Sequence, residues 1–323
     1  MKVLITGATG LVGNELVELC HEKGHDVNYL TTSKSKIENE PRYQGFFWNP
    51  EENKIDLNCF KGVDWVINLA GASISKRWTS SQKKAILNSR VNSLRILKQG
   101  LHQAEHNISA FVSASAIGIY PNSLEKFYEE DESKVDDSFL GEVTSLWEKE
   151  VDKLEGMGFP VAKVRIGLVM SQDGGALPEM ARPVNYYVGA AFGHGEQWQS
   201  WIHIHDLARM FLFIAENQLP GVYNGVGPNP VTNNKLIKEI AKVLQKPLLL
   251  PNIPKFAMKA ILGDMSYILF ASQRVSSKKI EEEGFLFDHV NICAALRDIY
   301  DTQETSESTR PDYQKEYTSQ TMD

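Results

Sequence analysis

Three glycines near the N-terminus have the spacing of a turn that binds phosphate. Gly7, Gly10 and Gly13 follow the apolar residues 3–5 and lead into the amphipathic residues 11–23. In such a strand, turn and helix, the first glycine allows a tight turn, the second lets the backbone approach a pyrophosphate, and the third allows close packing. Because a helix N-terminus also offers unpaired N–H groups, the spacing predicts a site for a cofactor with two phosphates. The backbone donors are expected at Thr9, Gly10, Leu11 and Val12.

The residues after the second expected strand, residues 25–30, indicate which cofactor this is. A dinucleotide-binding unit carries Asp or Glu there when the ribose 2′-hydroxyl is free, whereas a cation or hydroxyl cluster suits a 2′-phosphate. Residues 31–36 read Thr-Thr-Ser-Lys-Ser-Lys, and no carboxylate precedes Glu38. NADP(H) is therefore favoured over NAD(H), with a solvated basic loop as the alternative for Lys36. The residues expected at the phosphate are Thr31, Thr32 and Lys34.

Composition excludes several classes of protein. The formal net charge of −7 argues against a nucleic-acid partner, which requires concentrated Lys and Arg. Cys20, Cys59 and Cys293 are far apart and lack the paired spacing of metal ligands, which favours buried thiols in a reducing compartment. No signal peptide and no apolar run of the ~18 residues of a membrane span is present. We expect a cytoplasmic protein that acts on a small-molecule substrate and has no membrane partner. The sequence leaves open whether the protein is a homodimer.

Strand-like and helix-like segments alternate along the chain, which predicts an α/β protein with a doubly wound parallel sheet. Expected strands are residues 46–48, 63–69, 110–114 and 161–170, and expected helices are residues 80–105, 138–156, 207–217 and 233–244. Prolines between residues 247 and 254 suggest a linker. The sequence predicts a nucleotide-binding domain over residues 1–246 that includes the substrate loops, a small helical C-terminal extension over 247–300, and a disordered tail over 301–323, which is rich in Thr, Ser, Glu and Gln.

Several segments together resemble one family. They are GATGLVG (7–13), NLAGA (68–72), KRW (76–78), SRV (89–91), SASAIG (113–118), VRIGLV (164–169), GHGEQ (193–197) and SWIHIHD (200–206), with Ile253-Pro254, Gln273-Arg274-Val275 and Gly284-Phe285 further on. This chain is similar to the atypical short-chain dehydrogenase/reductase group, the epimerase-like family with a C-terminal extension domain (DUF1731-type), over about residues 1–300. The resemblance implies an NADP(H)-binding Rossmann fold of the extended or atypical short-chain dehydrogenase/reductase (SDR) type with a smaller substrate lobe.

Further cofactor contacts are expected at strand ends. Leu69, Ala70 and Gly71 end a central strand and should flank the adenine-side ribose. Arg90 falls where related dehydrogenases place a helical Asn near the cofactor, with a surface ion pair as its alternative. By resemblance only, Val164 and Arg165 line the nicotinamide end.

The usual catalytic pair of this fold is missing. Related enzymes use a tyrosine as acid/base and a lysine four residues later that lowers its pKa. None of the eleven tyrosines has Lys at the fourth following position, and residues 139–148 contain neither type. Ser115 aligns best with the family's catalytic serine, Tyr120 could deliver a phenolic proton, and Glu142 could act as acid/base if buried. Their alternatives are a serine at a strand end, a packing aromatic and a solvated helical carboxylate.

Four loop residues suit an anionic or sugar-like substrate, with a structural role equally open for the two tryptophans: Arg77, Trp78, Gln197 and Trp201. The nearby His203, His205 and Asp206 lack further clustered ligands, so no metal is expected. Asp206 is instead interpreted as the N-cap of the following helix.

These features predict an NADP(H)-dependent oxidoreductase or epimerase that acts on a small polar substrate, sugar-like or carbonyl. The missing tyrosine and lysine leave a second hypothesis open, a catalytically weak binding protein that senses NADP(H). A third is a non-redox epimerase or dehydratase that retains its cofactor.

Overall fold

The computed structural model describes residues 1–301, and the chain divides into two compact units. The first unit comprises residues 1–121, 133–165 and 208–223, and the second comprises residues 122–132, 166–207 and 224 onward. Most of the expected C-terminal tail therefore lies outside the described residues. Within residues 1–301, every helix is too short or too polar to cross a bilayer.

A nine-stranded sheet forms the centre of the first unit, in the order β13-β9-β7-β6-β1-β2-β4-β3, with β5 paired to β4. Strand β1 pairs in parallel with β2 and β6, and β6 pairs in parallel with β7. The apolar residues 3–5 of β1 are fully buried, as expected for a strand covered on both faces. The strands are β1 Lys2–Thr6, β2 Asp26–Thr31, β3 Asn39–Glu40, β4 Tyr43–Asn49, β5 Lys54–Ile55, β6 Trp65–Asn68, β7 Ala110–Ala116, β9 Val161–Ile166 and β13 Gly221–Gly225.

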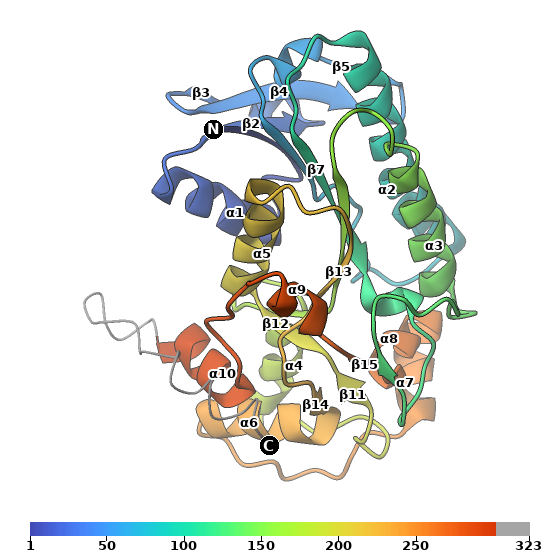
Figure 1. Ribbon diagram of the computed structural model, residues 1–323. Helices are drawn as coiled ribbons and strands as arrows, with labels where there is room; N and C mark the ends of the chain where they lie inside the picture. The colour runs from blue at the N-terminus through green and yellow to red at the C-terminus, as the bar shows by residue number, and fades with distance from the viewer. Residues whose placement is uncertain (302–323) are drawn as a thin grey trace. The chain divides into compact units, whose positions relative to one another are not determined.

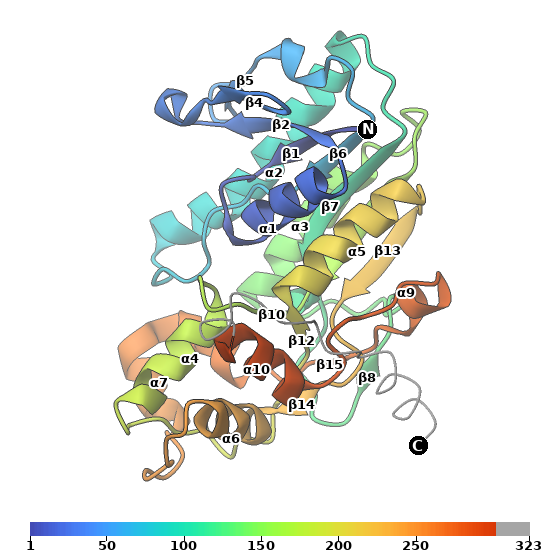
Figure 2. The ribbon, with the colours of Figure 1, turned by 90° about the vertical axis from the view of Figure 1, so that its left-hand side faces the viewer.

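Helices cover both faces of this sheet. Figures 1 and 2 show α1 and α5 side by side on one face and α2 and α3 on the other. The expectation of a doubly wound, mostly parallel sheet is confirmed, with β3 and β5 as antiparallel additions at β4. The helices are α1 Leu11–Glu22, α2 Ser80–Gln103, α3 Phe139–Asp152 and α5 Ile204–Glu216.

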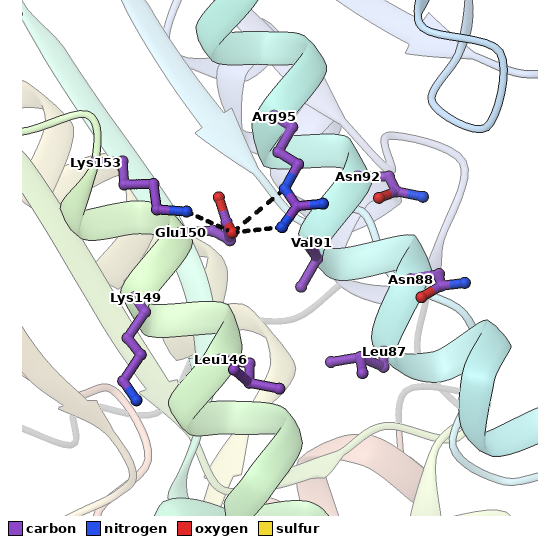
Figure 3. Close-up of a pocket in the computed structure, with 9 residues that line it drawn as sticks. All are labelled: Leu87, Asn88, Val91, Asn92, Arg95, Leu146, Lys149, Glu150 and Lys153. Carbon is purple, nitrogen blue, oxygen red and sulfur yellow. Dashed lines mark hydrogen bonds and ion pairs between the residues drawn. The ribbon is translucent and has the colours of Figure 1, made fainter.

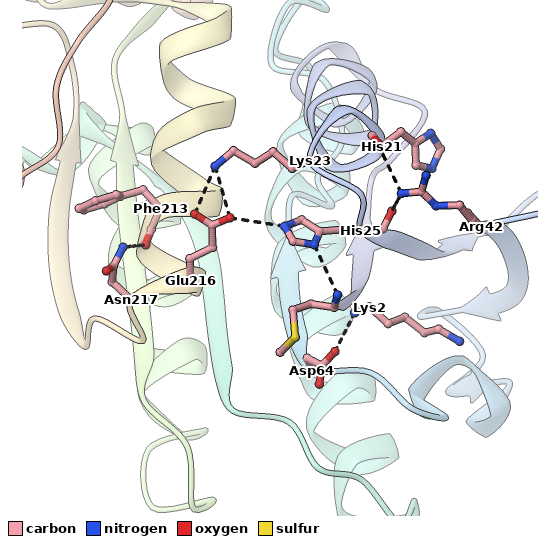
Figure 4. Close-up of polar contacts among 10 residues, drawn as sticks. Lys2, His21, Lys23, His25, Arg42, Asp64, Phe213, Glu216 and Asn217 are labelled. Atoms are coloured by element: carbon pink, nitrogen blue, oxygen red, sulfur yellow. Dashed lines mark hydrogen bonds and ion pairs between the residues drawn. The ribbon is translucent and has the colours of Figure 1, made fainter.

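Polar contacts hold α1 and α5 together (Figure 4). Nζ of Lys23, just after α1, lies 3.3 Å from each carboxylate oxygen of Glu216 at the end of α5. Nε2 of His25 lies 3.4 Å from the same carboxylate, and the His25 ring packs edge-on against Trp65. These contacts join two helices that are almost 200 residues apart in sequence.

The second unit is built from short strands and helices. Its strands pair as β10 with β12, β11 with β14, and β15 with β8. A buried core forms around Trp201, Leu236, Ile240 and Leu296. The elements are β8 Phe127–Tyr128, β10 Leu168–Met170, α4 Ala176–Asn185, β11 Trp198–Gln199, β12 Trp201–His203, β14 Val231–Thr232, α6 Asn233–Val243, α7 Lys255–Leu262, α8 Tyr267–Phe270, β15 Arg274–Val275, α9 Lys278–Glu282 and α10 Ile292–Asp301. Short single-turn helices are formed in the two units by Lys34–Lys36, Leu57–Phe60, Ile117–Ile119 and Gly263–Ser266.

The expected strand over residues 161–170 is wrong as a single element. It divides into β9 and β10 at Gly167, whose N–H donates to Gly225 O. A Cβ at Gly167 would lie 2.3 Å from Ser200 O, so only glycine fits where the two strands meet. The apolar run of the sequence hid this break.

Candidate functional site

The glycine turn has the geometry that its spacing predicts. Gly7 has a φ of 73°, and a Cβ there would lie 3.0 Å from the backbone of Leu69. A Cβ at Gly13 would lie 2.1 Å from Gly7 O, so the helix packs against the turn as closely as backbone allows. The turn therefore needs glycine for physical reasons at both positions.

The N-terminus of α1 is open to a ligand. The first helical bond runs from Asn14 N–H to Gly10 O, and no side chain caps the helix. The N–H groups of Leu11, Val12 and Gly13 thus have no partner in the helix, which leaves a partial positive charge there. This is the arrangement that binds pyrophosphate in dinucleotide-binding folds.

A buried row of polar side chains joins three neighbouring strands, and the sequence analysis missed it. Thr6 on β1 donates to Asn68 Oδ1 on β6 at 2.7 Å, and Asn68 donates to Ser113 Oγ on β7 at 3.0 Å. The Thr6 hydroxyl also accepts the N–H groups of Leu69 and Ala70, each at 3.1 Å. It thereby fixes the loop in which two of the expected cofactor contacts lie.

The end of β2 carries hydroxyls and a cation, as the sequence indicates. The Thr31 hydroxyl accepts the N–H of Ser33 at 3.2 Å, and the hydroxyls of Ser33 and Ser35 are 2.9 Å apart. Exposed Lys34 places Nζ 5.2 Å from the centroid of the Phe47 ring. Thr32 is exposed beside them. This surface suits a phosphate group.

Arg90 on α2 is a desolvated cation beside Gly71. Its Nη1 donates to Ala72 O at 3.2 Å and Ile86 O at 3.0 Å, and its guanidinium lies 4.9 Å from the centroid of the Trp147 ring. Burial lowers the pKa of Arg90 to about 10. Among residues 1–301, no carboxylate pairs with it, so the expected alternative of a surface ion pair is wrong. The indole Nε1 of Trp147 is buried and also lacks a hydrogen-bond partner.

Ser115 and Tyr120 converge on one buried ion pair. Ser115 Oγ donates to Glu148 Oε1 at 2.6 Å, and Arg165 donates to both oxygens of Glu148 at 2.8 and 2.9 Å. Nη1 of Arg165 also donates to Tyr120 OH at 2.9 Å. All four side chains are buried, as is Val164 on β9. The roles of Ser115, Tyr120, Val164 and Arg165 toward a substrate or cofactor stay predictions.

Glu142 does not meet the condition on which its catalytic role depends. It is exposed in the first turn of α3, where its carboxylate is solvated. The buried carboxylate of the same helix is Glu148, which the sequence analysis missed. The heptad-like spacing of apolar residues on α3 could have indicated that residue 148 faces inward, together with Trp147 and Val151.

The four expected substrate residues belong to different units. In the first unit Arg77 is exposed, while Trp78 is buried and donates from Nε1 to Ile74 O at 3.0 Å. In the second unit Gln197 donates from Nε2 to Phe192 O and Leu269 O, and Trp201 donates from Nε1 to Asn229 O. The polar groups of three of them are thus used within their own unit, and their contact with a substrate stays a prediction.

The interpretation of Asp206 as an N-cap is wrong. Helix α5 already begins at Ile204, and the buried carboxylate of Asp206 accepts the N–H groups of Asp288 and His289 at 2.8 and 2.9 Å. It also lies 3.1 Å from Nδ1 of His289. The sequence could not indicate this partner, which lies 83 residues away.

His203, His289 and Asp298 form a cluster in the second unit, in which both histidines are buried, Asp298 is half-buried and the ligand atoms lie within 4.8 Å of one another. The two rings stack at 3.8 Å with an angle of 20° between their planes. Although burial alone lowers it, the hydrogen bonds that His289 donates to Asp206 and Asp298 raise the pKa of His289 to about 9. Burial and the neighbouring His289 lower the pKa of His203 to about 4. The geometry fits a proton held between two carboxylates, and the expected lack of a metal stays a prediction.

A groove of about 360 Å³ lies between α2 and α3 (Figure 3). Leu87, Val91 and Leu146 line it, and Glu150 bridges Arg95 and Lys153 at its edge. None of the residues that the sequence assigns to cofactor, catalysis or substrate lines this groove.

Comparisons with known proteins agree with this geometry. The model of the NAD dependent epimerase/dehydratase family matches residues 3–145, and that of a domain of unknown function (DUF1731) matches residues 253–299. The epimerase family protein YfhF of Bacillus subtilis is 35% identical over 306 residues, which cover 94% of this chain and 100% of that protein. This chain belongs to the epimerase family. The resemblance drawn from the sequence motifs is thereby confirmed.

Solved structures of relatives place this epimerase family member among SDR folds. The human epimerase family protein SDR39U1, crystallised with NADPH, is 28% identical with a TM-score of 0.82 and covers 93% of this chain and 99% of its own. UDP-glucose 4-epimerase of Thermus thermophilus, crystallised with NAD, has a TM-score of 0.76 at 17% identity and covers 95% and 100%. At that identity it shows the fold alone.

This epimerase family member lacks the tyrosine and lysine pair where α3 faces the end of β7. A Cβ at Gly118 would lie 3.3 Å from Leu140 Cβ and 3.9 Å from Thr144 Oγ1. Leu140 and Thr144 have the four-residue spacing of the pair, yet neither titrates near neutral pH. The Thr144 hydroxyl also donates a hydrogen bond to Leu140 O at 2.8 Å. Leu140 and Thr144 therefore supply no general acid or base.

Proposed function

We propose that this protein binds NADP(H) through its first unit and uses it in oxidoreductase or epimerase chemistry on a small polar substrate. The open N-terminus of α1, framed by Gly7 and Gly13, carries the proposal. Thr31, Thr32 and Lys34 at the end of β2 favour the 2′-phosphorylated cofactor, and the NADPH in the human relative is consistent with this preference. When bound, the nicotinamide would supply a hydride donor or acceptor.

Residues of this chain would hold the cofactor in three places. The N–H groups of Leu11 and Val12 would bind the pyrophosphate, Lys34 would neutralise the 2′-phosphate, and the loop at Leu69–Gly71, fixed by Thr6, would flank a ribose. Arg90 would place positive charge beside that loop. The net charge of −7 supports a small-molecule substrate rather than nucleic acid.

Isothermal titration calorimetry with NADPH, NADP⁺, NADH and NAD⁺ tests this proposal. We expect NADPH or NADP⁺ to bind at least about tenfold more tightly than the unphosphorylated form, and Lys34→Gln to remove most of that preference. Lys61→Gln, which removes an exposed cation just after the single-turn helix Leu57–Phe60, is the matched control. Tighter binding of NADH or NAD⁺ by the unmodified protein would refute the preference, and no binding of any nucleotide would refute the proposal.

A catalytically weak NADP(H)-sensing protein is the second candidate, because Leu140 and Thr144 leave α3 without an acid/base pair. Reduced-cofactor absorbance, followed with a panel of sugar nucleotides and carbonyl compounds, separates the two. Turnover supports the enzyme, and tight cofactor binding without turnover or product supports the sensor. Product formed without net cofactor change would indicate a non-redox epimerase or dehydratase.

A further inference from the structure

Arg274 in the second unit packs between two aromatic rings. Its guanidinium carbon lies 4.5 Å from the centroid of the Trp198 ring and 5.0 Å from that of Phe127. Arg274 pairs with Phe127 across the parallel strands β15 and β8, and a bridge between Gln199 and Gln273 brings β11 alongside β15. Three short strands therefore build this stack, although their sequences are separated by about 70 residues at each step.

The surroundings of the stack are fixed by hydrogen bonds. Trp198 Nε1 donates to Leu124 O at 3.0 Å, and Trp198 N–H donates to Ser272 Oγ at 3.1 Å. Ser272 Oγ in turn donates to Ser123 O at 2.8 Å. The two aromatic contacts restrict rotation of the planar guanidinium.

The charge of Arg274 has no counter-ion in the part of the chain that is described. No carboxylate pairs with it, and its Nε is buried without a hydrogen-bond partner. Two of the carboxylates on the segment that carries Phe127 are engaged elsewhere, since Glu132 pairs with Lys126 and Glu130 accepts the N–H of Asn224. A half-buried guanidinium with an unpaired donor costs free energy, which an oxyanion could offset.

We propose that Arg274, held between Trp198 and Phe127, binds an oxyanion group of the ligand, so that the substrate of this protein carries a phosphate or a carboxylate. A planar, immobilised guanidinium presents paired N–H donors with the geometry of such a group. The identification of that group with the substrate rests on the proposed function, and it narrows the small polar substrate to an anionic one. The binding of an oxyanion by Arg274 does not depend on the proposed function.

NMR of the full chain with ¹⁵N-labelled arginine tests the proposal. The buried Nε–H of Arg274 gives a resonance that Arg274→Lys removes and so assigns. We expect this resonance to shift saturably on titration with sodium phosphate or sodium acetate, and to stay unshifted in sodium chloride of equal ionic strength. Calorimetry should show binding of that anion ~10-fold weaker in Arg274→Lys, because lysine cannot form the paired bonds. Arg182→Gln is the control, since it removes an exposed cation of the same unit that faces Glu179.

Each outcome identifies which molecule carries the oxyanion that Arg274 binds. A shift with phosphate alone indicates a phosphate-bearing substrate, and a shift with acetate alone indicates a carboxylate. If NADPH by itself shifts the resonance and competes with phosphate, the oxyanion belongs to the cofactor and the inference about the substrate is wrong. If neither anion shifts it, Arg274 only packs between the rings and the proposal is overturned. Because the titrations use the unmodified protein, a variant that misfolds affects only the assignment of the resonance. NADPH binding, measured separately, tells a failure of this proposal from a failure of the proposed function.

Discussion

Ser115 Oγ donates a 2.6 Å hydrogen bond to the Glu148 carboxylate, which is itself bound through both oxygens by Arg165. The serine that aligns with a catalytic residue is therefore part of a buried ion-pair network. To donate a hydrogen bond to a substrate oxygen, the Ser115 hydroxyl would have to leave Glu148. Otherwise it could only accept a hydrogen bond from a substrate hydroxyl while it still donates to Glu148. Tyr120 is tied to the same network through Arg165.

Glu148→Gln should be strongly destabilising. The substitution leaves the Arg165 cation buried without a negative partner, which typically costs about 3–5 kcal/mol of unfolding free energy. Urea denaturation monitored by tryptophan fluorescence measures the change. Glu52→Gln, which disrupts only the exposed pair with Lys54, is the control and should have no measurable effect. Equal stability of the two variants would mean that the network contributes nothing to folding.

Gly13→Ala should abolish nucleotide binding. Its Cβ would overlap Gly7 O at 2.1 Å, so the helix N-terminus must move away from the turn, and such overpacking costs about 1–3 kcal/mol of stability. Calorimetric titration with NADPH and thermal unfolding give the two readouts. Asn14→Ala, at the next and exposed position of α1, should keep both properties. Unchanged NADPH affinity in Gly13→Ala would show that the turn is not the binding site.

Arg90→Met should weaken NADPH binding ~10-fold, because it removes the cation that would lie beside the bound cofactor. The free energy of unfolding should fall by only about 1–2 kcal/mol, because the hydrogen bonds to Ala72 O and Ile86 O are lost. The methionine side chain can still pack against Trp147, and no ion pair is broken. Arg95→Met on the same helix removes an exposed cation that pairs with Glu150, and it should leave NADPH affinity unchanged. A loss of stability in Arg90→Met with full affinity would make Arg90 a structural residue.

Deprotonation of His289 should lower the free energy of unfolding as the pH rises. Its pKa is raised from 6.5 to about 9 in the folded protein, because its proton is shared with Asp206 and Asp298 despite burial. The stabilisation is fully present below pH 6.5 and is lost as the pH rises through 9. Burial lowers the pKa of His203 to about 4, so its contribution has the opposite sign and is lost as the pH falls from 6.5 toward 4.

Unfolding free energies of the unmodified protein and of His289→Gln, measured between pH 6 and about 9.5, test this effect. The difference between the two proteins should shrink as the pH rises. His102→Gln, an exposed histidine at the end of α2, should run parallel to the unmodified protein. A constant difference for His289→Gln would show that residue 289 does not hold the proton, and metal analysis of the purified protein would then test an ion in its place.

Contacts over short stretches of sequence were predictable, and contacts between distant segments were not. The glycine turn and the hydroxyls after β2 act within about ten residues, so spacing and residue type indicate them. The N-cap interpretation of Asp206 failed because its carboxylate is used by residues 288 and 289. The apolar spacing of α3 can indicate that Glu148 faces inward, but it does not indicate that Glu148 meets Arg165 on β9.

The sequence by itself determined the alternation of strands and helices, the phosphate-binding turn and the family, because apolar periodicity and glycine spacing act through local backbone geometry. Only the tertiary structure decided which charges are neutralised and which are not. Arg165 pairs with Glu148. Arg90 and Arg274 instead lie against aromatic rings, and no carboxylate of the described residues pairs with either of them. The physical reason is that the free energy of a buried charge depends on what the fold brings within a few ångströms of it, and those groups come from strands and helices far away in the chain.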